Sequence, residues 1–278
     1  MKQMSVTKSE ILATFRHEGA EGRQLIGAGA GTGLSARTAR AGGADFLVVY
    51  NSGRFRMAGR GSLAGLLAYG DANEIVMDMA SEVLPVVPGL PVFAGVNGTD
   101  PFRLMPQFLS GIQAAGYVGV QNFPTVGVFD GEFRANLEST GMGYDREVEM
   151  MKAASQLGLV TAPYVFNVAE TEAMVRLADV DIVVAHMGLT TSGAVGASVA
   201  VALEEAARRC QQICDAARRL KPEVLVLAHG GPIATSADWE FVRSKTTGLD
   251  GFLGASSMER LPVEQAIAAT VASFKRVR

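Results

Sequence analysis

The chain has 278 residues, and 48% of them are hydrophobic, which is enough to bury the core of one large domain. Its net charge is −3 and no basic patch stands out in the sequence, so we expect no nucleic-acid partner. The apolar runs are short and bounded by glycine or charged residues, so we expect no membrane-spanning segment and no membrane partner.

A short apolar run followed by a helical segment recurs along the chain. The near-continuous apolar character of the runs is typical of strands buried on both faces of a parallel sheet. In chain order the runs are 24–30, 45–50, 91–96, 116–121, 159–166, 181–186, 224–229 and 251–255. The helices predicted between and after them cover 35–41, 71–84, 101–115, 146–157, 170–178, 199–220, 236–245 and 263–275.

Strands that alternate with helices in this way predict an α/β fold, namely a single (β/α)8 TIM barrel over residues 23–278. An open doubly wound sheet is the alternative. Residues 1–22 carry a further predicted helix, which we expect to cover the bottom of the barrel or a partner subunit. We expect neither a signal peptide nor a membrane anchor in this segment.

The two cysteines, Cys210 and Cys214, lie four residues apart on one predicted helix. Their side chains share a fixed helical face, which is a poor geometry for a disulfide, and no further metal-ligating residues lie beside them. We therefore expect reduced thiols and a cytoplasmic location.

The ends of the predicted strands carry the candidate site, because TIM-barrel enzymes place their chemistry at the C-terminal face. Each predicted strand ends in polar residues or glycine. Gly29, in a glycine-rich loop, allows a ligand to approach the backbone, although tight packing is an equal alternative. The other candidates for binding on the first half of the chain are Asn51, Ser52, Arg54, Asn97, Gln121 and Asn122.

The connections 51–69 and 122–144 are long and carry glycines, aromatics and arginines. Long loops in a compact domain are usually functional. We expect them to form lids over the site, with Arg54 closing over the ligand, and simple packing loops are the alternative.

Two of the three histidines, His186 and His229, end consecutive apolar strands in the matching strings VVAHMG and VLAHGG. A single histidine in such a place is usually structural. Two in equivalent positions favour a role in proton transfer near neutral pH.

The strings HGGP and GASS follow the seventh and eighth predicted strands, where many barrels bind a phosphate or carboxylate. The predicted anion-binding residues are Gly230, Gly231, Gly254, Ser256 and Ser257. A tight turn with an N-capping serine is the alternative. Glu259 either pairs with Arg260 or faces the site as an acid or base.

No lysine ends a predicted strand, which disfavours a Schiff-base mechanism. The usual zinc motifs are also missing from the sequence. A Mg²⁺ site would have Asp100 and Glu170 as its nearest candidates. Asp100 is equally placed to cap a helix that begins at Pro101.

The chain resembles a known family at these strand ends. The strings that carry the resemblance are YNSGRFRMAGRGSLAGLLAYGDAN, VQNFPTVGVFDGEFRANLESTGMGY, AHMGLTTSGAVGA, AHGGPI and DGFLGASSMERLPVE. They resemble the phosphoenolpyruvate hydrolase-like TIM-barrel proteins, and the same barrel is similar to the C-terminal half of plant tobamovirus-resistance proteins. The likeness spans about residues 27–267.

This resemblance implies kinship with phosphonopyruvate hydrolase and with the phosphoenolpyruvate mutase and isocitrate lyase group. Members of that group cleave or rearrange bonds next to a 2-oxo acid, with magnesium. They carry paired acidic metal ligands after the third strand, where this chain reads NGTD, from Asn97 to Asp100.

The leading hypothesis is therefore a hydrolase or lyase that acts on a small anionic 2-oxo acid. It would cleave a C–P or C–C bond or hydrolyse a phosphoester, with His186 or His229 as the acid or base. A non-catalytic barrel that binds a nucleotide or metabolite is the alternative, and metal-free isomerase or retro-aldolase chemistry is a third hypothesis. Alanine-rich helix faces such as 199–207 permit subunit packing, and we expect a homo-oligomer.

Overall fold

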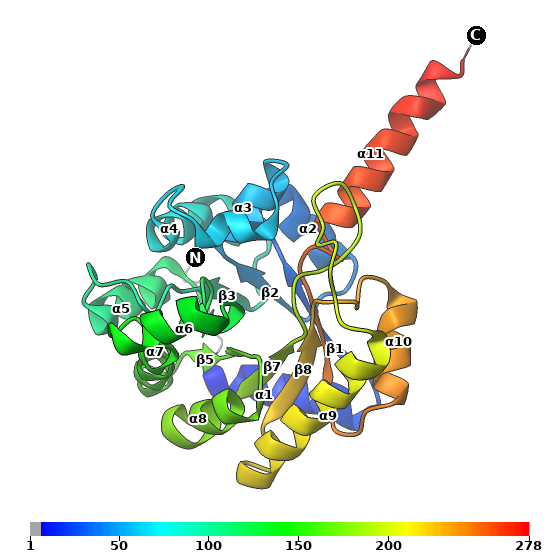
Figure 1. Cartoon of the computed structure of the whole chain (residues 1–278). Helices are drawn as coiled ribbons and strands as arrows, with labels where there is room; N and C mark the ends of the chain where they lie inside the picture. The colour runs from blue at the N-terminus through cyan, green and yellow to red at the C-terminus, as the bar shows by residue number, and fades with distance from the viewer. Residues whose placement is uncertain (1–6, 278) are drawn as a thin grey trace.

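The computed structural model describes residues 7–277 and places one curled parallel sheet at the centre, with helices around it (Figure 1). The strands are β1 (Leu25–Gly29), β2 (Phe46–Val49), β3 (Val92–Gly95), β4 (Gly119–Gln121), β5 (Val160–Thr161), β6 (Tyr164–Val165), β7 (Ile182–His186), β8 (Leu225–His229) and β9 (Gly251–Gly254). They run in the order β5-β4-β3-β2-β1-β9-β8-β7-β6. Because β1 pairs with β9 as well as with β2, the topology is that of a TIM-type sheet and not of an open doubly wound one.

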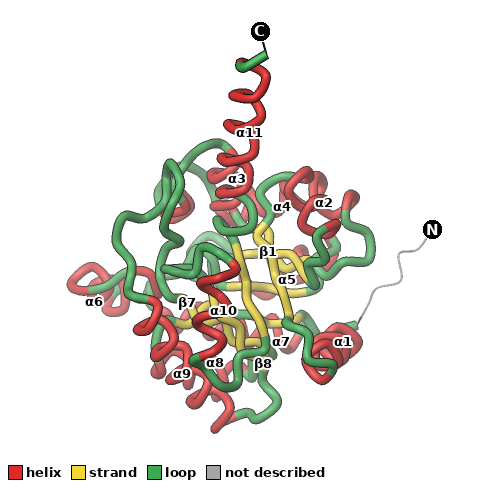
Figure 2. The backbone as a smooth tube through the Cα atoms, turned by 90° about the vertical axis from the view of Figure 1, so that its right-hand side faces the viewer, coloured by secondary structure: helices red, strands yellow, loops and turns green. Residues whose placement is uncertain are grey.

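Helices follow the strands and surround the sheet, apart from the first, which lies at its N-terminal end, and the last, which projects into solvent (Figures 1 and 2). They are α1 (Lys8–Ala20), α2 (Gly33–Ala41), α3 (Asn51–Met57), α4 (Ala72–Val83), α5 (Met105–Ala115), α6 (Gly131–Ser139), α7 (Tyr144–Gln156), α8 (Val168–Ala178), α9 (Leu203–Leu220), α10 (Ser236–Ser244) and α11 (Arg260–Lys275). Three short 3-10 helices are η1 (Ser62–Leu66), η2 (Leu84–Val86) and η3 (Val126–Val128).

The strand count differs from the sequence prediction at one place. The strand expected over 159–166 is divided into β5 and β6 by Ala162 and Pro163. Proline has no backbone N–H to give to a ladder, so regular pairing stops there. The backbone still bonds on both sides of the link, since Ala162 N–H donates to Val120 O at 3.0 Å and Val184 N–H donates to Pro163 O at 2.9 Å.

The two connections expected to be lids contain more regular structure than the sequence indicated. The first starts at once as helix α3 and continues into η1, and the second contains η3 and α6.

Asp100 is not a helix cap, because α5 begins only at Met105 with Pro106 in its first turn. Asp100 instead accepts a hydrogen bond from the backbone N–H of Phe102 at 2.9 Å.

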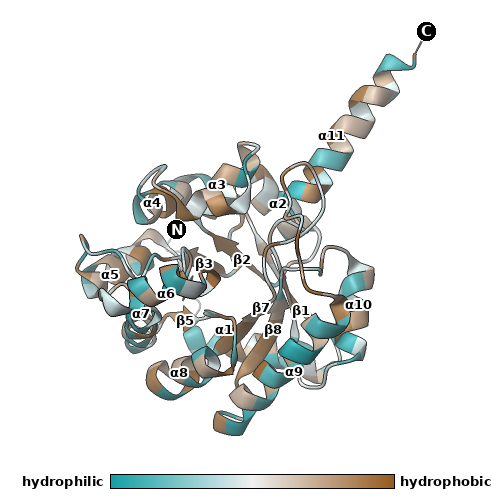
Figure 3. Ribbon diagram, in the orientation of Figure 1, coloured by the Kyte–Doolittle hydropathy of each residue, from teal (hydrophilic) through white to brown (hydrophobic). Residues whose placement is uncertain are grey.

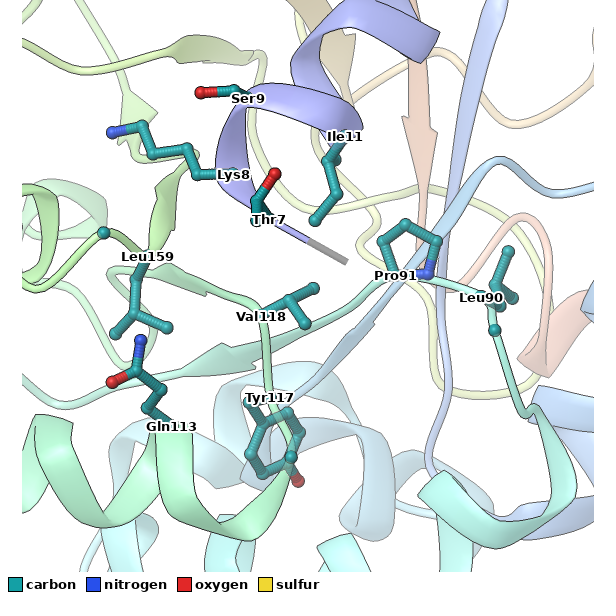
Figure 4. Close-up of a pocket in the computed structure, with 13 residues that line it drawn as sticks. Thr7, Lys8, Ser9, Ile11, Leu90, Pro91, Gln113, Tyr117, Val118 and Leu159 are labelled. Carbon is teal, nitrogen blue, oxygen red and sulfur yellow. The ribbon is translucent and has the colours of Figure 1, made fainter. Parts of the chain in front are cut away.

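Helix α1 packs at the N-terminal end of the strands. Its Phe15 ring lies 5.6 Å from the ring of Phe46, and Lys8 Nζ lies 2.8 Å from Asp181 Oδ2 just before β7. Between α1 and the segments that lead into β3, β4 and β5 lies a pocket of about 590 Å³, which Figure 4 shows with Lys8, Pro91 and Tyr117 among its lining residues. This face is opposite the strand ends that carry the predicted site.

Strands such as β2 and β8 are apolar, as their brown colour in Figure 3 shows. The rings of Phe46 and Phe93 stack with centroids 4.9 Å apart, and both residues are fully buried. Glycines in the neighbouring strands leave room for these rings. A Cβ on Gly27 would lie 2.3 Å from Phe46, and one on Gly119 would lie 2.5 Å from Phe93.

Helix α11 leaves the body of the molecule and projects into solvent, as Figures 1 and 2 both show. Beyond its first turns the helix is exposed, including Ile267, Val271 and Phe274. Within residues 7–277, no helix combines the length and apolarity that crossing a membrane requires.

We predict that Gly27→Ala destabilises the protein by about 1–3 kcal/mol, because the new methyl group overlaps the Phe46 ring. Gly19→Ala in α1 is the matched control, since nothing lies within 4 Å of its Cβ position. Alanine favours a helix over glycine, so the control should gain about 0.5–1 kcal/mol. Urea denaturation measures both, and an unchanged free energy of unfolding for Gly27→Ala would contradict this packing.

Candidate active site

The C-terminal ends of the strands enclose a small buried cavity, which we call the inner chamber. Its volume is about 30 Å³, enough for about two water-sized atoms. The side chains that give it chemical character are Tyr50, Arg56, Tyr164, His186, His229 and Ser256. They come from five different strand ends, so the chamber exists only in the folded sheet.

Both predicted histidines lie in the inner chamber, and their ring centroids are 4.7 Å apart. His229 Nδ1 lies 2.7 Å from Leu253 O. A carbonyl can only accept, so Nδ1 carries the proton and Nε2 presents its lone pair toward the Tyr164 hydroxyl at 3.2 Å. His186 has the opposite arrangement, because its Nδ1 accepts the backbone N–H of Gly188 at 3.0 Å.

Burial keeps both imidazoles neutral. It lowers the pKa of His229 to about 4, and it lowers the pKa of His186 well below the ordinary value, with the nearby His229 adding to the effect. Neutral His186 therefore carries its proton on Nε2 and is a hydrogen-bond donor. Neutral His229 is an acceptor, so the pair offers one donor and one acceptor at neutral pH.

Beside the chamber lies a buried ion pair whose arginine the sequence did not indicate. Arg56 Nη2 lies 3.0 Å from Glu259 Oε2, and each side chain is only 1% exposed. Glu259 accepts a second hydrogen bond from the backbone N–H of Gly31. Both carboxylate oxygens of Glu259 are thus occupied, and Glu259 holds Arg56 in place instead of pairing with Arg260 or facing the chamber as a free acid.

Arg56 retains capacity to bind an anion. Its Nε is buried and has no hydrogen-bond partner among the described residues. Its guanidinium lies over the ring of Tyr50, 5.2 Å from the centroid, which fixes the plane of the group. A buried arginine with an unsatisfied donor beside a cavity is suited to bind a carboxylate.

Arg54, which the sequence placed over the ligand, lies elsewhere. Its side chain is 38% exposed and points toward Asp78 on α4, with 3.8 Å between Arg54 Nη1 and Asp78 Oδ2. Asn51 and Ser52 hold the segment that follows α3. Asn51 Nδ2 donates to Gly65 O at 2.8 Å, and Ser52 Oγ donates to Ser62 O at 2.6 Å.

Polar residues at the end of β4 contact the backbone of Tyr164, which lines the chamber. Asn122 bonds to both backbone groups of Tyr164, and its Nδ2 also donates to Glu147 Oε2 at 2.6 Å. Glu147 is fully buried, which raises its pKa to about 8. Gln121 is buried with its Oε1 unpartnered among the described residues, and Asn97 bonds to Thr99 away from the chamber.

Of the glycines and serines after β8 and β9, some pack closely against neighbouring backbone and Ser256 lines the inner chamber. Gly230 and Gly231 have φ values of 69° and 60°, and a Cβ on either would overlap a carbonyl oxygen after β7. Gly254 lies against Met258 and Ser257. Ser256 lines the chamber, whereas the Gly231 N–H is already bonded to Gly188 O.

The remaining candidates are placed as follows. Gly29 packs against Arg56 and Ala255, since its Cβ would lie 3.2 Å from both. The two carboxylates proposed for Mg²⁺ do not come together. Asp100 bonds to Asn73, Arg103 and Phe102, and Glu170 bonds to Arg134 and Phe166. Across residues 7–277, no three His, Cys, Asp or Glu side chains are grouped so that they could hold a metal ion. Because Asp100 and Glu170 are each engaged by an arginine and lie apart, this pair does not fit a Mg²⁺ site.

Comparison with known proteins identifies the family. The model of the phosphoenolpyruvate hydrolase-like family matches residues 10–277. The chain belongs to the phosphoenolpyruvate hydrolase-like family. Over 270 residues it is 58% identical to the tomato (Solanum lycopersicum) ToMV resistance protein Tm-1(GCR237). The match covers 97% of this chain and 36% of the tomato protein, so the chain spans about a third of that relative's length.

Solved structures of the phosphoenolpyruvate mutase and isocitrate lyase superfamily share the fold. One is 2,3-dimethylmalate lyase, with a TM-score of 0.59, 16% identity and coverage of 98% of this chain and 89% of that one. Another is phosphoenolpyruvate phosphomutase from Streptomyces platensis subsp. rosaceus, with a TM-score of 0.60, 18% identity and coverage of 95% and 87%. At these identities the likeness establishes the fold of this member of the phosphoenolpyruvate hydrolase-like family and nothing finer.

We predict that Glu259→Gln lowers the free energy of unfolding by about 3–5 kcal/mol, because it leaves Arg56 charged and buried without a counter-ion. The double variant Arg56→Met with Glu259→Gln should be less destabilised than Glu259→Gln alone, since no unpaired charge remains. Glu149→Gln, in an exposed pair with Arg146, is the control and should change stability by about 0–1 kcal/mol. Equal losses in the single and double variants would contradict this role for Glu259.

Proposed function

We propose that the protein is a lyase that cleaves a C–C bond in a small anionic 2-oxo acid bound at the C-terminal mouth of the sheet. The observation that carries this proposal is the inner chamber, where a buried arginine, a neutral histidine donor and a neutral histidine acceptor converge. A 2-oxo acid needs these three functions in one place: a cation for the carboxylate, a donor for the oxo group and a base.

Each group has a separate role in the proposal. Arg56 binds the substrate carboxylate, and Glu259 positions Arg56. His186 Nε2–H donates to the 2-oxo oxygen, where negative charge develops as the bond breaks. The hydroxyl proton of the departing fragment passes to His229 by way of Tyr164, and the electron pair of the broken bond forms the enolate of the retained oxo acid.

In this reaction His186 acts as a neutral hydrogen-bond donor. Because its pKa is lowered, it stays uncharged while it stabilises the developing oxyanion. Hydrolysis of a C–P bond or of a phosphoester would need a further group to position water. A donor and an acceptor side by side in one small cavity, with ring centroids 4.7 Å apart, favour C–C cleavage over those reactions.

The assay that tests this function releases pyruvate from 4-hydroxy-2-oxo acids and detects it with a coupled dehydrogenase. His229→Asn is expected to lower kcat by about 10²–10⁴-fold through loss of the base. Arg56→Gln should raise KM by about 10–100-fold, because it removes a charged hydrogen bond to the carboxylate.

The matched control is Arg54→Gln, two residues from Arg56 and directed to Asp78, which should change neither constant by more than about twofold. Each assay is run with Mg²⁺ and with a chelator, and the same rate is expected in both. A rate that depends on Arg54 and not on Arg56, or that requires Mg²⁺, would overturn the proposed roles. Binding of an oxo acid without any turnover would favour a non-catalytic metabolite-binding barrel.

We also propose that the protein works in the cytoplasm as a homo-oligomer. Cys210 and Cys214 are free thiols buried in α9, which suits a reducing compartment. The projecting α11 exposes Ile267, Val271 and Phe274 at 61%, 57% and 75%, and their spacing places them on one helical face. An exposed apolar helix face of this kind is buried by packing against a second copy of the chain.

We predict that Val271→Asp combined with Phe274→Asp converts the oligomer to a monomer, because a charge would be buried in the interface. Ala269→Asp, on the opposite face of the exposed α11, is the control and should leave assembly unchanged. Sedimentation velocity measures both. A wild-type monomer, or a double variant that assembles as the wild type does, would contradict the proposal.

A further inference from the structure

A second cavity adjoins the inner chamber, and we call it the outer chamber. Its volume is about 150 Å³. Four residues line both cavities, namely Ser62, Leu189, Thr190 and Ser256. The hydroxyls of Ser62 and Ser256, which lie 3.3 Å apart, stand at the boundary. The two cavities are therefore adjacent, and the contact between Ser62 and Ser256 lies between them.

The wall of the outer chamber comes from two segments that meet over the mouth. One is η1 with its flanks, which contributes Gly61 and Leu63, and the other is the segment 188–202 after β7, which contributes Val195 and Ala197. The Cβ position of Gly61 lies 3.5 Å from Val195 O, so the segments are in contact. Ala197 N–H donates to Thr190 O at 3.1 Å and folds the second segment back on itself.

The outer chamber offers no free charge to a ligand. Among the described residues that line it, Arg260 is the charged one, and its side chain is 4% exposed. Its Nη1 pairs with Glu264 at 3.0 Å, and its Nη2 donates to Ser192 O at 2.9 Å. Glu264 also accepts the backbone N–H of Ala194 at 3.0 Å. Both terminal nitrogens of Arg260 are therefore occupied by groups of the wall, whereas Arg56 in the inner chamber keeps an unpartnered Nε among the described residues.

A second anionic group on the substrate would lose its water here without gaining a counter-ion, which is unfavourable. An alkyl group would instead contact Leu63, Leu189 and Val195. A cavity of about 150 Å³ has room for a molecule the size of benzene. The size and lining of the outer chamber therefore match a short uncharged side chain.

We infer that the outer chamber is a specificity pocket for an alkyl substituent, so that the substrate is a 2-oxo monocarboxylate with an apolar tail and not a dicarboxylate or a phosphonate. This inference rests on the proposed function, because Arg56 must bind the carboxylate while the tail of the substrate extends into the outer chamber. Leu63, Leu189 and Val195 determine specificity, and Arg56 supplies the shared anchor.

The test is a calorimetric titration of the full chain with pyruvate, 2-oxobutanoate, 2-oxopentanoate and 2-oxoglutarate. The affinity is expected to rise about fourfold with each added methylene from pyruvate to 2-oxopentanoate. 2-Oxoglutarate has the same carbon chain as 2-oxopentanoate with a terminal carboxylate, and it should bind at least about tenfold more weakly.

Val195→Lys places an unpaired cation in the wall and should reverse the preference toward 2-oxoglutarate. Val199→Lys is the matched control, because Val199 belongs to the same segment, is 84% exposed and does not line the chamber. The control should keep the wild-type order of affinities.

The outcomes separate this inference from the proposed function. One outcome is that pyruvate binds to the wild type and binds more weakly to Arg56→Gln, while affinity does not rise with tail length or is highest for 2-oxoglutarate. The alkyl pocket would then be wrong, and the role of Arg56 in the proposed function would be supported. If none of the four acids binds to the wild type, both fall. If Val195→Lys and Val199→Lys behave alike, the outer chamber does not select the tail.

Discussion

The buried contact between Arg56 and Glu259 joins three parts of the chain that are far apart in sequence. Arg56 lies on α3 after β2, Glu259 lies just before α11, and the Gly31 N–H that completes the cluster follows β1. An ion pair at this depth is costly to assemble and more costly to break, because either charge alone would be stranded away from water. The contact therefore ties the segments after β1, β2 and β9 together at the mouth of the sheet, beside the inner chamber.

The histidines depend on that same enclosure. Their neutral state follows from burial, and their proton positions follow from Leu253 O and from the Gly188 N–H. Opening the chamber to water would remove the cause of the lowered pKa values. Structure and reactivity are thus set by one condition, the exclusion of water from the strand ends.

The sequence allowed the fold class, the strand positions and the location of the two histidines at the strand ends to be predicted, because each depends on a local pattern. An apolar run marks a strand, and a histidine at its end lies at the mouth. Arg56 and Tyr164 were not predicted. Arg54 and Arg56 lie two residues apart and point to different faces of α3, a helix that the sequence did not indicate. Tyr164 begins β6, within the strand that Pro163 divides. Long-range contacts alone showed which arginine is buried.

Aromatic rings fill the N-terminal end of the sheet, where Phe15 packs at a tilt against Phe46 and Phe46 stacks on Phe93. In the proposed reaction, a substrate that occupied both chambers would therefore leave by the mouth. The fragment in the outer chamber would depart first, and the fragment held by Arg56 would follow once the Ser62–Ser256 boundary had cleared. The proposed lyase would then release its two products in order, with the small oxo acid last.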